Sequence, residues 1–123
     1  MNRTPDATSR DLPDATGSLV VDERRAWTAE EAWAVVDRIA HQVRAATDDG
    51  RRRAAVFAEN AGEAVLAHVG AMRAGASVVA VNSHLAAPEV AYQLGVGDVA
   101  LVIAGPATAA RAVEAASTVD GCR

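Results

Sequence analysis

Residues 54–104 read AAVFAENAGEAVLAHVGAMRAGASVVAVNSHLAAPEVAYQLGVGDVALVIA, and this stretch decides the fold. It contains three short apolar runs, at 54–58, 77–81 and 99–104. Runs of this length that are rich in valine are typical of strands buried on both faces of a parallel sheet. Because segments with helical features separate the runs, the sequence predicts an α/β fold in which right-handed crossovers link parallel strands.

The segment between the first two runs predicts a helix over 61–74. Asn60 is placed to cap its start, with Glu63 at the third position. Gly75 follows where a helix needs a left-handed C-terminal residue. Three long apolar side chains fall on one stripe, which we expect to face the core: Val65, Val69 and Met72.

Two further helices are predicted downstream. One begins near Pro88, whose fixed φ suits a first turn, and ends at Gly95 or Gly97. The other follows Pro106 and runs over about 107–117. Each of the three apolar runs is thus followed by a helix.

Upstream of these units the sequence predicts a short hairpin and one more helix. The polar turn 22–24 lies between two apolar segments and indicates a hairpin over 18–27. Thr28 and Glu31 form a Thr-x-x-Glu capping box at the start of a helix over 29–46. The apolar positions that recur at helical spacing are Val35, Val36, Ile39 and Val43. The polar positions expected to face away are Asp37, Arg38, His41 and Arg44.

The predicted fold class is therefore α/β: an incomplete parallel sheet with flanking helices and a short N-terminal hairpin. Three strands are few for such a sheet and leave an apolar edge unpaired. After the last helix, at 120–123, a βα progression would continue with another strand. Residues 1–17 carry charges and turn formers and predict a disordered tail, whereas residues 18–123 predict one partial subdomain.

Size and charge exclude several classes of function. The 123 residues, 12.7 kDa, allow one domain, and the net charge is −4. All twelve basic residues are arginine, and the absence of lysine excludes Schiff-base chemistry and a Walker-type phosphate site. A negative chain without a basic face argues against nucleic acid as a partner. The only basic run, 51–53, follows Asp48 and Asp49 and predicts a solvated loop rather than a phosphate site.

A few residues predict the cellular compartment of the protein and whether it binds a metal. Cys122 is the only cysteine, so a disulfide or a cysteine-based metal site within the chain is excluded, and the expected location is cytoplasmic. The first seventeen residues lack the apolar run of a signal peptide. Charged residues interrupt the most apolar stretch, 54–81, so no transmembrane segment is predicted. The histidines have no metal-ligand spacing, and we expect no metal site: His41, His68 and His84.

Two glycine patterns resemble nucleotide-binding motifs. Residues 95–100 fit G-x-G-x-x-A, and residues 70–77 resemble a P-loop with Ala76 in the lysine position. Both lead from a predicted helix into a predicted strand, whereas phosphate binding needs a strand followed by a helix N-terminus. We therefore interpret both patterns as helix ends.

The best-placed candidates for ligand contact follow the predicted strands, because ligands of open α/β sheets bind beyond the carboxyl ends of the strands. They are Glu59, Asn60, Asn82, Ser83, His84 and Gly105. This rule predicts a location and no reaction. For Asn60 a helix cap, and for His84 a solvated loop position, is the more frequent role of such residues.

Several segments together resemble one family. In chain order they are the helix start at 27–31 (WTAEE), the pair 59–60 (E-N), 70–76 (GAMRAGA), 81–85 (VNSHL), 88–94 (PEVAYQL) and the apolar run 99–104 (VALVIA). In this order they resemble the early N-terminal region of adenylate-forming ligases, most closely acyl-CoA synthetases. One departure is Ala86, where that family often has a Thr or Ser helix cap, and we expect it to weaken the helix start by about 1 kcal/mol.

The resemblance implies a two-step ligase. A carboxylate attacks the α-phosphate of ATP to give an acyl-adenylate and pyrophosphate, and the thiol of coenzyme A then displaces AMP. In that family a Ser/Thr/Gly-rich loop ending in Pro-Lys-Gly, an acidic ribose contact, a magnesium-binding glutamate and a C-terminal lysine carry the chemistry. None of these motifs lies in this sequence, so it assigns no catalytic, cofactor-binding or metal residue here. ATP, Mg²⁺ and coenzyme A are implied only for a full-length enzyme.

Our leading hypothesis is that residues 18–123 are a partial N-terminal subdomain of such a ligase, inactive alone and completed by the remaining domains. The full-length enzyme would activate a carboxylic, fatty acid and transfer it to coenzyme A. An alternative is a stand-alone α/β interaction module that a partner chain completes. A third is a small nucleotide- or flavin-binding protein that uses the strand ends.

Overall fold

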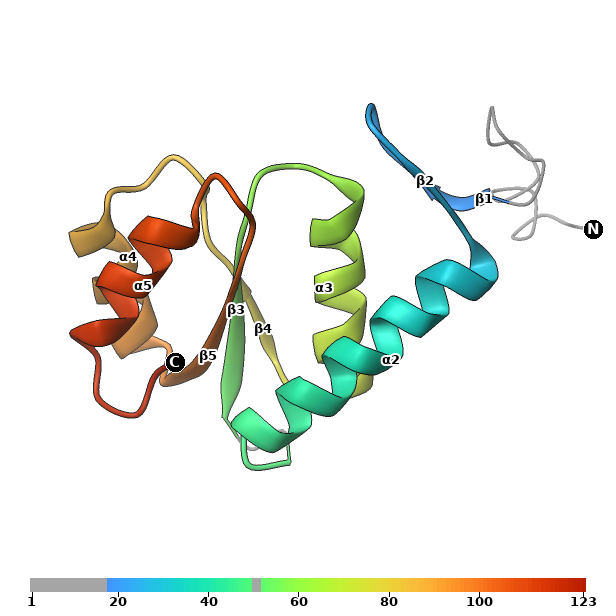
Figure 1. Ribbon diagram of the computed structural model, residues 1–123. Coiled ribbons are helices and arrows are strands. Elements are labelled where there is room, and N and C mark those ends of the chain that lie inside the picture. Colours follow the sequence, from blue (N-terminus) through green and yellow to red (C-terminus); the bar gives the residue numbers. More distant parts are fainter. Residues whose placement is uncertain (1–17, 50–51) are drawn as a thin grey trace, which may run out of the picture.

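The computed structural model describes residues 18–49 and 52–123, so the tail predicted at 1–17 lies outside the described residues. Two sheets and the helices beside them make up the fold (Figure 1). The elements in chain order are β1 (Ser18–Val21), β2 (Ala26–Thr28), α2 (Ala29–Ala46), β3 (Arg53–Phe57), α3 (Gly62–Arg73), β4 (Val78–Ala80), α4 (Ala87–Val96), β5 (Val99–Ala104) and α5 (Ala109–Ser117). The predicted α/β class, with a parallel sheet and an N-terminal hairpin, is confirmed.

The main sheet has three parallel strands in the order β4-β3-β5. Ala54 of β3 lies opposite Val78 on one side and opposite Leu101 on the other. The strand of this sheet that comes first in the chain, β3, is therefore the central one. Residues 54–57 of β3 are all buried, as its continuous apolar sequence predicts.

Helices cover both faces of this sheet (Figure 1). On one face α2 and α3 pack over small side chains of the core, among them Ala40, Val43, Ala54, Ala71 and Ala74. On the other face α4 and α5 enclose a larger core that includes Phe57, Val90, Leu94, Val99 and Ala115. The sequence has few aromatic residues, and Phe57 is the one aromatic side chain in the core between the sheet and α4 and α5.

The hairpin and α2 form as predicted. The β1 and β2 strands pair antiparallel, and Trp27 of β2 is 1% exposed against Ala32, Val36 and Leu66. At the start of α2 the Glu31 N–H donates to the Thr28 hydroxyl (3.1 Å), and the Thr28 N–H donates to the Glu31 carboxylate (3.0 Å). This reciprocal pair confirms the capping box.

The prediction for α3 is wrong in two respects. Its N-cap is Ala61, which offers no side-chain hydrogen bond, so Asn60 is not the cap. Val65 and Met72 are 50% and 65% exposed, and the buried face consists instead of Gly62, Leu66, Ala67, Gly70 and Ala71. The reason is the close approach of α2, because a Cβ on Gly70 would lie 2.6 Å from the Cγ2 of Ile39. Small residues therefore make up most of the buried face of α3, and Leu66 is its one large side chain.

Helix ends account for both glycine patterns. Gly75 has φ +87° after the end of α3, and α4 ends at Val96 with Gly97 as its C-cap. Neither pattern opens a helix, so the interpretation as helix ends is confirmed. At the start of α4, Ala86 has no side-chain acceptor, and only its own N–H is capped, by the Glu89 carboxylate (3.0 Å).

The final helix begins later than predicted, at Ala109 instead of 107. The reason is the buried Thr108, whose hydroxyl accepts a hydrogen bond from the Gly105 N–H (3.1 Å) and donates to the Phe57 carbonyl. These bonds hold residues 105–108 in a turn before α5 starts.

The basic run at 51–53 is no simple solvated loop, and that prediction is corrected for the two residues that the structure describes. Arg53 donates to the Gly97 carbonyl (2.8 Å). Arg52 pairs with Asp98 (3.0 Å) and donates to the Gly121 carbonyl (3.0 Å). Both guanidinium groups reach segments more than forty residues away, which the local charge pattern does not reveal.

Candidate functional site

The carboxyl ends of the three parallel strands are the expected place for a ligand in this architecture. The six candidate residues lie there, in the loops after β3, β4 and β5. They do not form one cluster. Among them only Asn60 lines a hollow of about 620 Å³ beside the hairpin, and His84 is exposed, as the solvated-loop alternative holds.

The crevice between β3 and β5 is filled by the protein itself. The connections after these neighbouring strands lead to α3 and α5 on opposite faces, which makes this the switch point of the sheet. A Cβ on Gly105 would lie 3.5 Å from the Cβ of Ala58. Beneath them the Thr108 hydroxyl is fully buried and bonded to the Phe57 carbonyl. The position that usually receives a ligand is closed by this side chain.

The loop after β4 is tied to α5 by Arg111. Its guanidinium donates to the carbonyls of Ser83 (2.9 Å) and Leu85 (2.6 Å) and lies 5.1 Å from the centre of the Phe57 ring. Within the same loop the Asn82 carboxamide oxygen accepts the His84 N–H (2.8 Å). Asn82 and Ser83 are thus engaged in fixing the loop conformation.

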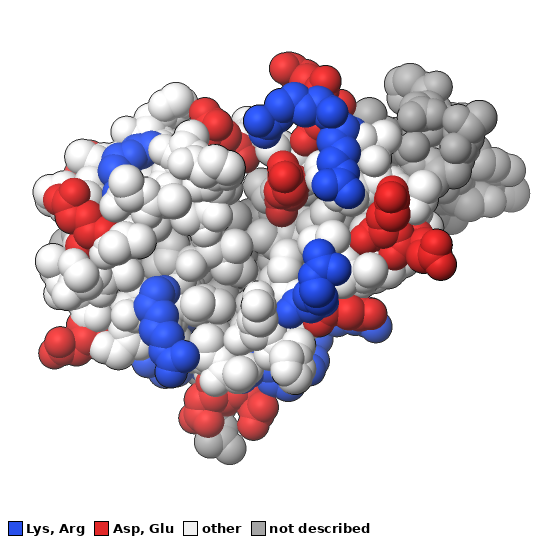
Figure 2. Space-filling model, in the orientation of Figure 1, with Lys and Arg blue, Asp and Glu red and all other residues white. Residues whose placement is uncertain are grey.

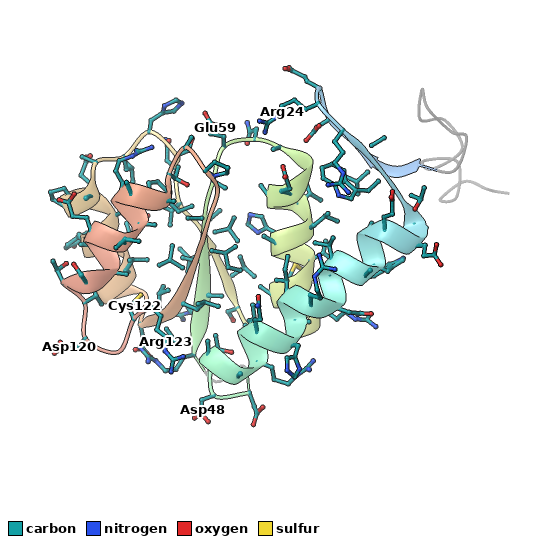
Figure 3. All side chains as sticks on the ribbon, viewed as in Figure 1. Arg24, Asp48, Glu59, Asp120, Cys122 and Arg123 are labelled. Carbon is teal, nitrogen blue, oxygen red and sulfur yellow. The ribbon has the colours of Figure 1, made fainter. Side chains whose placement is uncertain are left out.

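A hollow of about 620 Å³ lies between the hairpin turn, the start of α3 and the ends of β3 and β4. Apolar side chains form much of its wall: Val20, Val56, Ala58, Ala61, Ala64, Val65, Ala80 and Val81. Its polar groups include Arg24, Asn60 and His68. Figure 3 shows Arg24 and Glu59 at the same end of the molecule, one on the hairpin turn and the other after β3. The hollow is an amphipathic surface with no arrangement of groups that defines a reaction.

Asp22 fastens the hairpin to the domain beside this hollow. One carboxylate oxygen accepts the N–H groups of Arg24 and Arg25 (both 2.8 Å), and the other accepts the Gly62 N–H at the start of α3 (2.7 Å). Asp22 thus takes the capping role that the sequence suggested for Asn60. The Gly62 N–H, followed by those of Arg24 and Arg25, lowers the pKa of Asp22 despite an opposing effect of burial.

We expect the hydrogen bonds of Asp22 to give a pH-dependent part of the stability. Because the pKa is lower in the folded state, this part is complete above the ordinary aspartate value of about 3.9 and is lost as the pH falls through the folded value. Asp22→Asn should be less stable than wild type at pH 7, and the difference should vanish in strong acid. Urea unfolding across pH 2–7 measures it.

The exposed neighbour Glu23 offers a matched control for this experiment. Glu23→Gln removes the same charge from the same turn without touching the bonds to Gly62, so its stability should follow wild type at each pH. Curves for Asp22→Asn and wild type that stay equally separated down to pH 2 would contradict the assignment.

The sequence did not point to three groups that shape this region: Asp22, His68 and Arg111. The sequence shows Asp22 only as part of a polar turn, because its partner Gly62 lies forty residues away. His68 shows no metal-ligand spacing in the sequence, and the structure places it half-buried in the wall of the hollow. No local signal distinguishes Arg111 from other helical arginines.

In the described residues, neither the distribution of charge nor a cluster of metal-ligating side chains marks a second site. Figure 2 shows arginine and acidic side chains scattered over one face, with the two signs close together. Within residues 18–49 and 52–123, no three His, Cys, Asp or Glu side chains gather as metal ligands. Over the same residues, no helix is both long and apolar enough to span a membrane.

Comparison with known protein families shows to which family this chain belongs. A model described as AMP-binding enzyme matches residues 3–122, nearly the whole sequence. The chain belongs to the AMP-binding enzyme family. This confirms the resemblance carried by the segments at 59–60, 70–76, 81–85 and 88–94. No curated protein matches the sequence significantly.

Solved structures that resemble this AMP-binding chain include a fatty acyl CoA synthetase and a benzoate CoA ligase. The N-terminal domain of FACL13 from Mycobacterium tuberculosis is 29% identical over 78% of this chain and 24% of that one, with a TM-score of 0.63. Mycobacterium tuberculosis fatty acyl CoA synthetase is 28% identical over 80% and 19%, with a TM-score of 0.65. A benzoate CoA ligase from Burkholderia xenovorans, 22% identical over 95% and 24%, shares the fold with a TM-score of 0.76.

The AMP-binding chain spans about a quarter or less of the length of these three solved structures. The match therefore concerns one α/β portion of such a protein. The fold described above, with its three parallel strands and four helices in residues 18–49 and 52–123, is that portion.

Proposed function

We propose that this chain is the N-terminal portion of an AMP-dependent acid–CoA ligase. The complete enzyme would join a carboxylic acid, of the fatty acid class, to coenzyme A through an acyl-adenylate. The observation that carries the proposal is the family match over residues 3–122, together with relatives at 28% and 29% identity that are a fatty acyl CoA synthetase and FACL13. A cytoplasmic location is part of the proposal, because a lone thiol suits a reducing compartment.

We assign this portion a scaffolding role and no part in the chemistry. Transfer at the α-phosphate of ATP needs cations and N–H groups directed at the phosphate oxygens. The chain has no lysine, and several of its arginines already have partners within the fold. Arg52, Arg53 and Arg111 bind backbone carbonyls, and Arg73 pairs with Asp37 (3.0 Å). These residues do not fit a triphosphate site, so the groups that hold ATP, Mg²⁺ and coenzyme A belong to the remaining domains.

Two assays test whether this portion is only a scaffold and whether the remaining domains carry the chemistry. The isolated chain should give no carboxylate-dependent ATP–pyrophosphate exchange above a blank without protein. A chimera should retain exchange with fatty acids when residues 18–123 replace the matching segment of Mycobacterium tuberculosis fatty acyl CoA synthetase. The control is the same synthetase with that segment deleted, which should be inactive. Exchange by the isolated chain, or an inactive chimera that is folded and soluble, would overturn the proposal.

A second candidate is an interaction module that a separate chain completes. Three large apolar side chains on α4 and α5 favour it, because each is at least 70% exposed: Tyr92, Val96 and Val113. The two candidates differ in the chimera, since only a ligase portion supports exchange when it is covalently part of the synthetase.

A further inference from the structure

The strand β5 lies at an edge of the sheet but has the character of a central strand. Its six residues, Val99–Ala104, are all apolar. Val99 and Val102 pack against the core under α4 and α5, and Leu101 and Ile103 pack against the core under α2 and α3. Proteins normally protect a free edge by keeping it short or by placing charges on it. The opposite edge, β4, is only three residues long, whereas β5 carries neither protection.

The backbone of Arg123 already lies on this edge in the manner of a parallel strand. The Arg123 N–H donates to the Ala100 carbonyl (2.9 Å), and the Arg123 carbonyl accepts the Val102 N–H (2.6 Å). Bonds from one residue to the two positions that flank Leu101 are the pattern of a parallel pair. The next groups in this register along β5 are the Val102 carbonyl and the Ala104 N–H.

Arg52 holds the turn that brings Arg123 to this place. Its guanidinium joins the Gly121 carbonyl (3.0 Å) to the Asp98 carboxylate (3.0 Å), just before β5 begins. Gly121 has φ +76°, a conformation that glycine adopts without strain. Figure 3 shows Cys122 and Arg123 beside the start of β5. Burial raises the pKa of the Cys122 thiol, which agrees with a docked segment.

We infer that the free edge of β5 is an addition site for a parallel strand that starts at Arg123, and that Arg52 is the positioning residue that sets its register. The occupant, a strand of the same ligase, rests on the proposed function. The edge and its register rest on the contacts of Arg123 and Arg52 alone.

The first test appends five residues, Val-Thr-Val-Thr-Val, to the full chain. The N–H of the second appended residue should donate to the Val102 carbonyl, because it follows Arg123 by two positions. Two variants carry proline as the first or as the second appended residue, and Gly-Ser-Gly-Ser-Gly is the control. We expect the thermal midpoint to rise by about 4 °C for the valine extension and for proline at the first position. Proline at the second position should abolish the rise.

A rise of equal size with Gly-Ser-Gly-Ser-Gly or with proline at the second position would overturn the addition site. No rise with the valine extension would overturn it as well. Because no ATP or acid is involved, these outcomes are independent of whether the proposed ligase function holds.

The second test concerns the register and uses the unextended chain. Arg52→Met should speed hydrogen exchange at the Val102 N–H and alkylation of Cys122, each by about tenfold. Arg53→Met removes the same charge one residue away and should leave both rates close to wild type. Arg52→Lys, a gentler change, should behave like Arg52→Met because an ammonium group cannot span Gly121 and Asp98 together. Equal effects of the substitutions at 52 and 53 would overturn the role of Arg52.

Discussion

Gly62→Ala should separate the hairpin from α3. A Cβ at this position would lie 2.2 Å from Cζ3 and 2.8 Å from Cη2 of Trp27, which is itself 1% exposed. An indole ring packed on all sides cannot move away cheaply, so the hairpin or the helix start must shift. Such a shift also lengthens the bond from the Gly62 N–H to Asp22. Overpacking of this kind costs about 1–3 kcal/mol, and we expect a value near the upper end.

The natural control for this substitution is Gly95→Ala. Gly95 lies in α4 and a Cβ there would meet nothing within 4 Å. Replacing a helical glycine in open space usually stabilises by about 0.4–1 kcal/mol. Urea unfolding followed by tryptophan fluorescence should therefore move in opposite directions for the two variants. A Gly62→Ala protein as stable as wild type would show that Trp27 does not pack as described.

Phe57→Ala should be among the most destabilising single truncations in the core, because Phe57 and Trp27 are its largest fully buried side chains. The ring is fully buried at the centre of the α4 and α5 side, among Val90 and Leu94, and Arg111 lies 5.1 Å from its centre. Removing a buried phenylalanine ring costs about 3–5 kcal/mol. That is a large share of the roughly 5–15 kcal/mol by which domains are usually stable. Much of the Phe57→Ala protein should be unfolded at 37 °C.

The matched variant Phe57→Leu keeps most of the volume and should cost less than about 1.5 kcal/mol. Thermal unfolding by circular dichroism measures both variants. In the folded fraction of Phe57→Ala we also expect faster hydrogen exchange at 83–86, because Arg111 loses the ring beneath it while it holds the carbonyls of Ser83 and Leu85. Equal midpoints for the two variants would contradict this account of the core.

The elements that could be predicted from the sequence are those governed by neighbours in the chain. Thr28 and Glu31 are three residues apart, and their capping box starts α2 where predicted. The strand at Val99–Ala104 was predicted with its final bounds because its apolar run is uninterrupted. The face of α3 could not be predicted, because the tight contact of Gly70 with Ile39 decides it, and hydrophobic periodicity alone favours valine over glycine.

The candidate site was predicted less well, for the same reason. The rule about strand ends places the candidate residues at the carboxyl edge of the sheet, but what occupies that edge depends on distant residues. Thr108 closes the crevice through a bond to Phe57, fifty-one residues earlier. Asp22 reaches across to Gly62 and places the hairpin over the hollow. The family could be predicted from the sequence, because its short motifs occur in a fixed order along the chain. Recognising that order does not require knowledge of any contact in the folded protein.

The central position of β3 has a consequence for how the protein is made on the ribosome. The first strand of the main sheet to emerge is β3, and both later strands of that sheet pair with it, β4 on one side and β5 on the other. When β4 and β5 are synthesised, each therefore finds its neighbour β3 already present. Vectorial synthesis and sheet assembly can proceed in the same order, which shortens the time for which bare apolar edges face the cell's other nascent chains.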